Sequence, residues 1–230
     1  MIDTISNSIF FGIGLTLGGF LLGSFLKEKY KIFIFNPLLI AITICIATLL
    51  LLNIDYASYN KGASHISMLL TPATVCLAIP LYEQLQLLKK NATAILLGIT
   101  SGVIISAIAI MAMSILFGLT HTQYVTLLPK SITTAIGIGL SAELNGYIAI
   151  TVAAIIITGL TGNIIGDKLC NIFGIKHPIA KGVAIGTSTH VMGTSKAMEL
   201  GEVEGAMSSL SVAVAGIITV AAALIFENFI

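Results

Sequence analysis

The side chains best suited to chemistry in this chain gather in one polar stretch, His177–Leu210, which reads HPIAKGVAIGTSTHVMGTSKAMELGEVEGAMSSL. It carries histidine, lysine and glutamate side chains and a run of hydroxyls. Glycines recur in it at positions 182, 186, 193, 201 and 205. Glycine allows the backbone to bend and to pack closely against a neighbour. The stretch is therefore our first candidate for a functional site.

The composition places this polar stretch in a membrane protein. Of the 230 residues, 57% are hydrophobic and only 9% are charged, which is typical of a polytopic α-helical membrane protein. A polar segment broken by glycines is costly among membrane helices unless it lines a cavity. We therefore interpret His177–Leu210 as half of a transport site. Thr187, Ser188, His190 and Thr194 are its candidate substrate-binding residues.

The ionisable groups of the stretch leave alternatives open. A lone histidine is usually structural, but within a membrane the proton affinity of His190 can couple transport to pH, and we favour that role. Three ionised carboxylates would be intolerable in hydrocarbon, so they must pair, cap a helix, bind protons or lie at the interface. If this part is helical, Glu199 and Glu202 share a face and Glu204 points elsewhere. Capping at the interface and proton coupling both remain open for these three glutamates.

A second polar segment, Pro129–Gly146, is too short for an ordinary span. Lys130, Ser131, Thr133 and Thr134 precede its apolar run. This pattern indicates a re-entrant hairpin or half-helix whose N-terminus offers hydroxyls, a lysine and free N–H groups, as an anion site requires. A simple hydroxyl-capped helix start is the alternative. Lys130 is a better candidate partner for a carboxylate than Lys196, and either lysine could instead reach an interface.

The elements that must position these residues are about six full transmembrane helices. We predict them at Ile5–Leu26, Ile32–Leu52, Ser64–Leu88, Ala92–Phe117, Tyr147–Ile165 and Ser208–Phe226. Three further candidate substrate-binding residues lie in these spans: Asn36, which could instead cap a helix, Thr71 and Asn163. The glycines at 14, 18, 19 and 23 suit close packing within the protein and are also compatible with a homodimer.

The lysines orient the chain. If both polar segments are re-entrant and enter from opposite sides, the lysines at 27, 29, 31, 89, 90, 168, 176 and 181 all lie at the inner face, as the positive-inside rule requires. Leu69–Pro72 with Gly98–Thr100 recurs as Leu127–Pro129 with Gly159–Thr161, which indicates an inverted repeat. We predict a single all-α integral membrane domain over residues 1–230, with scaffold helices in 1–63 and a broken-helix transport core in 64–230.

Other classes of function are excluded or disfavoured. The net charge of +1 and the absence of arginine argue against nucleic-acid binding. Cys45, Cys76 and Cys170 lack metal-binding spacing. The chain has no nucleophile elbow, HExxH motif or phosphate-binding loop. We expect no enzyme activity, no cofactor and no metal.

At these residues the sequence resembles the LrgB/CidB family over essentially its whole length. The resemblance rests on Asn36-Pro37, on Lys130–Thr134, and above all on GTSTHVMGT and ELGEVEGAMSSL between Gly186 and Leu210. Ala135 stands where the family usually has proline. The resemblance implies a fold similar to the sodium–proton antiporter and bile-acid symporter group, and a location in the bacterial cytoplasmic (inner) membrane. It also implies a smaller LrgA/CidA-type membrane partner.

The resemblance implies two accounts of function. One is a holin/antiholin-like regulator of murein hydrolase activity and cell lysis. The other, from relatives that include the plastid glycolate/glycerate transporter, is solute movement. Buried polar residues and opposed broken segments suit the second account better, because a protein that makes simple membrane lesions needs neither. We expect a secondary transporter of small 2-hydroxy or 2-oxo monocarboxylates, with proton coupling through His190, Glu199, Glu202 or Glu204 as a candidate.

Overall fold

The computed structural model describes residues 8–30, 35–69, 72, 75, 76 and 78–230, and these form helices without a strand. The chain divides into two compact units, Met1–Cys76 and Leu77–Ile230, which are taken separately below. Among the described residues, four helices are long and apolar enough to cross a membrane: Ile9–Tyr30, Leu85–Phe117, Ile148–Ile172 and Glu202–Phe229. The expected count of six full spans is therefore not confirmed.

The first unit contains α2 (Ile9–Tyr30), α3 (Pro37–Leu51) and α4 (Tyr56–Ser67). Asn36 begins α3, because its Oδ1 accepts hydrogen bonds from the backbone N–H groups of Leu38 and Leu39. Gly19 and Gly23 of α2 pack against the backbone of α3, whereas Gly14 and Gly18 have no atom within 4 Å of where a Cβ would lie. Two of the four glycines expected to pack closely, Gly19 and Gly23, thus do so within the unit.

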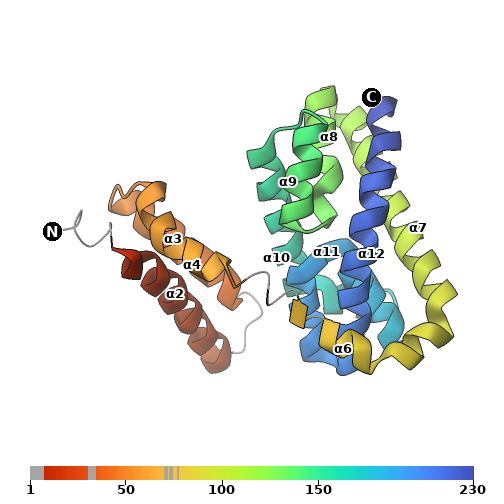
Figure 1. Cartoon of the computed structure of the whole chain (residues 1–230), viewed down its shortest axis with the longest axis horizontal. Coiled ribbons are helices and arrows are strands. Elements are labelled where there is room, and N and C mark those ends of the chain that lie inside the picture. The colour runs from red at the N-terminus through yellow and green to blue at the C-terminus, as the bar shows by residue number, and fades with distance from the viewer. Residues whose placement is uncertain (1–7, 31–34, 70–71, 73–74, 77) are drawn as a thin grey trace. The chain divides into compact units, whose positions relative to one another are not determined.

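The second unit contains three long helices, α7 (Leu85–Phe117), α10 (Ile148–Ile172) and α12 (Glu202–Phe226). The shorter elements, seen in Figure 1, are α6 (Ala78–Glu83), α8 (His121–Leu127), η1 (Leu128–Ser131), α9 (Thr134–Glu143), α11 (Pro178–Leu200) and η2 (Glu227–Phe229). The predicted start of a span at Ala92 is wrong, because α7 begins at Leu85 and runs on through Lys89 and Lys90. Lysine is a good helix former, so these charges do not end the helix.

The chain doubles back over α8, η1 and α9, so the predicted hairpin includes α8, which precedes Pro129–Gly146. η1 and the β-region residues Ile132 and Thr133 separate α8 from α9, and α9 returns to the start of α10. There the backbone N–H of Tyr147 donates to Thr126 Oγ1 of α8 (2.8 Å), and Thr151 Oγ1 donates to the Thr126 carbonyl (2.9 Å). Figure 1 shows α8 and α9 at the end of this unit where the C-terminus lies. η1 is thus the tip of a hairpin and contacts α11.

The helix α11 reverses direction at His190, whose backbone has φ 45° and ψ −147°. In its first arm, Gly182 lies against Glu204 and Gly186 against Ser208, so this arm runs parallel to α12. In its second arm, Thr194 bonds Ser208 (2.8 Å between hydroxyl oxygens) and Met198 lies against Gly205, so this arm runs antiparallel to α12. The break predicted in this stretch is present, and it makes α11 a helical hairpin.

The tip of the α11 hairpin is held against α10. His190 is 4% exposed, and its Nε2 lies 3.0 Å from the Ile155 carbonyl oxygen of α10. A ring nitrogen that bonds a carbonyl carries the proton and donates it. Gly159 makes room for the ring, because a Cβ there would lie 2.7 Å from His190 Cε1. A histidine thus occupies a backbone conformation that glycine adopts more easily.

The end of α11 corrects one sequence-based prediction. Glu199 and Glu202 do not share one helical face, because α11 ends at Gly201 in extended backbone and α12 begins at Glu202. Glu202 and Glu204 lie in the first turn of α12, where carboxylates face the positive end of the helix dipole. Glu199 forms an ion pair with Lys196 (2.8 Å). All three glutamates lie at the base of the hairpin, away from His190 at its tip.

Replacing Gly186 with alanine should loosen the hairpin from α12. The added Cβ would meet the backbone of Ser208, including its Cα at 2.8 Å, and backbone cannot rotate away. We expect a loss of about 1–3 kcal/mol, measured as a lower Tm of the purified protein in detergent. Gly139→Ala in α9 is the matched control, since nothing lies within 4 Å of its added Cβ. Equal Tm values for both variants would contradict the packing.

Two substitutions of His190 separate its backbone strain from its hydrogen bond. His190→Ala and His190→Gly both lose the bond to the Ile155 carbonyl, but only glycine relieves the positive φ. We expect the glycine variant to unfold at a higher temperature than the alanine variant, by the equivalent of about 1–3 kcal/mol. An alanine variant as stable as the glycine variant would show that α11 does not reverse through this conformation.

Candidate functional site

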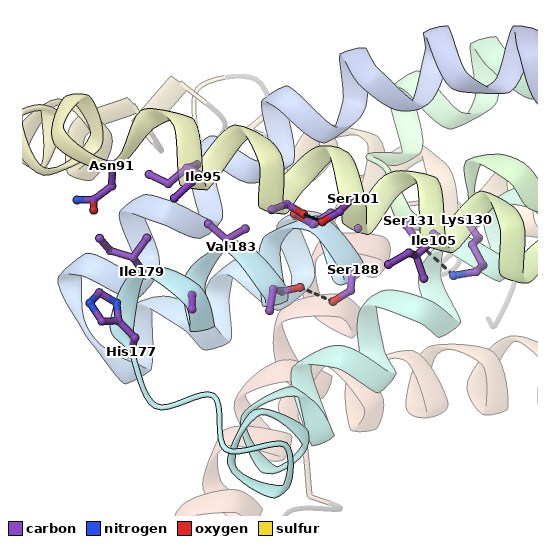
Figure 2. Close-up of a pocket in the computed structure, with 17 residues that line it drawn as sticks. Asn91, Ile95, Ser101, Ile105, Lys130, Ser131, His177, Ile179, Val183 and Ser188 are labelled. Atoms are coloured by element: carbon purple, nitrogen blue, oxygen red, sulfur yellow. Dashed lines mark hydrogen bonds between the residues drawn. The ribbon is translucent and has the colours of Figure 1, made fainter.

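A cavity of about 590 Å³ lies between α7, the first arm of α11 and the hairpin tip η1 (Figure 2). Three elements distant in sequence meet in its wall. The residues that line it are Asn91, Ala94, Ile95, Gly98, Ser101, Gly102, Ile105 and Ser106 of α7, Lys130 and Ser131 of η1, and His177, Ile179, Ala180, Val183, Ala184, Thr187 and Ser188 at the start of α11. Its volume suits a small ligand.

The cavity has two ends of different character. Figure 2 shows His177 and Asn91 at one end, Ile95 and Val183 between, and Lys130 with Ser131 near Ser188 at the other. The polar side chains are thus few and mostly gathered at the η1 end, and the middle is apolar. A small ligand with a charged head would be oriented by such a distribution.

Lys130 supplies the positive charge of the site. Its side chain is half-buried, and its Nζ donates to Ser131 Oγ (3.1 Å). Among the described residues, no carboxylate lies within ion-pair distance of it. Desolvating a charge without a counter-charge is costly. A small anion in the cavity would provide the missing negative charge.

A smaller chamber of about 20 Å³ adjoins the cavity where α7, η1, α11 and α12 meet. Ser106, Ser131 and Thr187 line both the cavity and the chamber. Thr219 of α12 lines the chamber but not the cavity. Its volume is enough for one water molecule, and four hydroxyl side chains surround it. The chamber is therefore very small, and its lining combines these hydroxyls with apolar side chains.

The structure brings together four of the predicted site residues: Lys130, Ser131, Thr187 and Ser188. Thr133 and Thr134 begin α9 and do not line the cavity, and Thr133 makes no capping hydrogen bond through its side chain. Asn36 caps α3 in the first unit. Thr71 lies outside the described residues.

Three other predicted site residues hold the second arm of α11 instead of lining the cavity. Asn163 Nδ2 of α10 donates to the Met192 carbonyl (2.8 Å) and to Ser195 Oγ (2.9 Å). Thr194 Oγ1 donates to the His190 carbonyl (3.1 Å) and also bonds Ser208. His190 bonds the Ile155 carbonyl. These contacts fix the hairpin whose first arm lines the cavity.

Sequence reasoning missed the contribution of α7 to the site. Ser101 and Ser106 face the cavity, and Asn91 and His177 lie at its other end. The available signal was the Gly98 and Gly102 pair, because small residues mark a helix face that a neighbour approaches closely. Val183 and Thr187 of α11 are the side chains nearest to those glycines.

The base of the hairpin carries an ion pair outside the cavity. Lys181 Nζ of α11 lies 2.6 Å from Asp167 Oδ1 of α10, and both side chains are partly buried. Cys170 of α10 packs beside both arms, against Ile185 and Ala197. The hairpin is thus held to α10 at its base as well as at its tip.

Comparisons with known proteins match this chain over nearly its full length. The sequence profile of the LrgB-like family matches residues 16–229. Two curated relatives are each 38% identical over 222 residues, which is 96% of this chain and 96% of theirs: the antiholin-like protein LrgB of Bacillus cereus (strain B4264) and that of Bacillus anthracis (strain A0248). No solved structure matches it significantly. On this similarity, the chain belongs to the LrgB-like family.

Proposed function

We propose that this protein is a carrier of small 2-hydroxy or 2-oxo monocarboxylates across the bacterial cytoplasmic membrane. The observation that carries the proposal is the cavity that Lys130 lines together with Ser131, Thr187 and Ser188, where no carboxylate of a described residue pairs with the lysine. A monocarboxylate supplies the opposite charge, and its second oxygen suits the hydroxyls. A family member of this kind would act with a small LrgA/CidA-type membrane partner.

The opposed hairpins support a carrier over a simple pore. A carrier needs a binding site that each side of the membrane can reach in turn. The tip of the α8–η1–α9 hairpin and the first arm of α11 both line the cavity, and neither is a continuous span. Movement of either hairpin would change access to Lys130. Proton coupling is part of the proposal, with His190, Glu199, Glu202 and Glu204 as its candidates.

A second candidate function has direct support from the relatives, whose names describe an antiholin-like role. In this function the protein restrains cell lysis and murein hydrolase activity together with its partner. The two candidates are compatible if the effect on lysis follows from a changed flux of metabolite or protons. The names favour the antiholin-like role, and the cavity favours the carrier.

Lys130→Gln should reduce uptake of labelled pyruvate, glycolate and glycerate into proteoliposomes by at least about tenfold, because tenfold corresponds to the loss of only about 1.4 kcal/mol of binding. Lys89→Gln, an exposed lysine of α7 outside the cavity, is the matched control and should transport normally. Each protein is measured alone and with the LrgA/CidA-type partner, with and without a pH gradient. Equal uptake by both variants would refute the anion site.

The same variants distinguish the two functions in cells. If the effect on lysis depends on transport, cells that carry Lys130→Gln should lose both solute uptake and the lysis phenotype, and cells with Lys89→Gln should keep both. Uptake of labelled acid and autolysis rate are measured on the same cultures. A Lys130→Gln protein that still controls lysis normally while transport is lost would separate the antiholin-like function from the carrier.

A further inference from the structure

Three consecutive residues of α11 carry hydroxyls, but only one of them lacks a hydrogen-bond partner. Ser188 Oγ donates to the Ala184 carbonyl (2.7 Å), and Thr189 Oγ1 donates to the Ile185 carbonyl (2.6 Å). Such bonds to the preceding turn are the ordinary arrangement for serine and threonine in a helix. Thr187 is only 8% exposed, yet its hydroxyl has no partner among the described residues.

Packing against α7 accounts for the difference. A Cβ at Gly102 would lie 2.9 Å from Thr187 Cγ2, so the threonine methyl faces this glycine closely. The methyl and the hydroxyl share one carbon and stand in staggered positions, so fixing the methyl also fixes the direction of the hydroxyl. The hydroxyl is thereby withheld from the Val183 carbonyl, the partner that the helical pattern offers it. Thr187 instead lines the cavity and the small chamber.

Thr187 lines the same cavity as Lys130, which carries the positive charge of the site. Ser131 lines both the cavity and the chamber, as Thr187 does, and Ser131 Oγ accepts the hydrogen bond of Lys130. The lysine, the serine and the threonine thus form one polar wall. A ligand that satisfies this wall needs a negative group for Lys130 and a further oxygen a short distance away.

We propose that Thr187 determines specificity by recognising an oxygen on the carbon next to the carboxylate of the bound acid. The inference rests on the proposed carrier of 2-hydroxy or 2-oxo monocarboxylates and assigns recognition of their second oxygen to one residue, Thr187. A buried hydroxyl without a partner is costly, and a ligand oxygen removes that cost. An acid without the second oxygen leaves the hydroxyl unpaired, so the site rejects it.

Glycolate and acetate form a matched pair of probes, because they differ only by the hydroxyl. The full-length protein, with its membrane partner where uptake requires it, is titrated with each acid at fixed pH and ionic strength. The concentration that gives half of the maximal Tm increase is recorded. For wild type we expect acetate to require at least about tenfold more than glycolate.

The variants Thr187→Val and Thr187→Ser isolate the hydroxyl. Valine keeps the shape of threonine without the hydroxyl, so glycolate binding should weaken until the two acids bind about equally, while acetate binding is unchanged. Serine keeps the hydroxyl but lacks the methyl that holds it away from the Val183 carbonyl, so its preference for glycolate should be smaller than that of threonine and larger than that of valine. Thr43→Val of α3, which removes a hydroxyl bonded to the Leu39 carbonyl, is the control and should leave the preference intact.

Stability without ligand gives a second readout. Removing a hydroxyl that has no partner should leave the Tm of Thr187→Val at or above that of wild type, whereas a lower Tm would mean that the hydroxyl has a structural partner and would overturn the inference. A preference for glycolate that survives in Thr187→Val, as expected if a water molecule in the chamber satisfies the hydroxyl, would also overturn it. Absence of binding and uptake for both acids in wild type would instead refute the carrier itself.

Discussion

The reversal of α11 at His190 is the feature on which the rest of the second unit depends. A helix that turns back among helices apolar enough to span a membrane must satisfy its backbone polar groups inside the protein, because hydrocarbon offers no hydrogen-bond partner. The arms of α11 solve this by packing on each other, on α10 and on α12. Glycines let the first arm lie directly against the backbone of α12. The His190 ring bonds the Ile155 carbonyl and holds the turn at α10.

Because α11 reverses, its polar side chains fall into two groups: those of the second arm bond neighbouring helices, and those of the first arm line the cavity. Hydroxyl and amide groups of the second arm bond α10 and α12, as Asn163, Thr194 and Ser208 do. The first arm presents Thr187 and Ser188 to the space beside α7. Charged residues at the base, among them Lys181, Asp167 and Glu199, pair near the helix ends. One side of the hairpin is thus structural, and the other is available to a ligand.

Buried polar groups of this membrane protein are therefore of two kinds, those that have a partner within the fold and those that do not. A buried hydroxyl that bonds its own helix, such as that of Thr189, is satisfied and contributes to the fold. Within the part of the chain that the structure describes, Lys130 has no carboxylate partner and the Thr187 hydroxyl has no hydrogen-bond partner, and both arrangements are costly. Both residues line one cavity, and the proposal of anion binding rests on that position. The relatives named antiholin-like are 38% identical over nearly the whole chain and of similar length, so the same cavity can be looked for in them.

The sequence by itself determined that the chain is helical, that it has helices apolar enough to span a membrane, and that polar residues of 129–146 and 177–210 are the candidates for a site. These conclusions follow from local composition, because hydropathy decides which segments hydrocarbon accepts. Lys130, Ser131, Thr187 and Ser188 were found in this way.

Tertiary structure decided that α11 turns at a histidine instead of at one of its glycines, and that the glutamates lie at the opposite end of the hairpin from it. It also decided that the Thr187 hydroxyl, unlike those of Ser188 and Thr189, has no partner among the residues that the structure describes, because its methyl packs on Gly102, which is 85 positions away in sequence (187 − 102). The Gly98 and Gly102 pair marks a face of α7 that a neighbour can approach, but the local pattern does not say which residue of α11 contacts it.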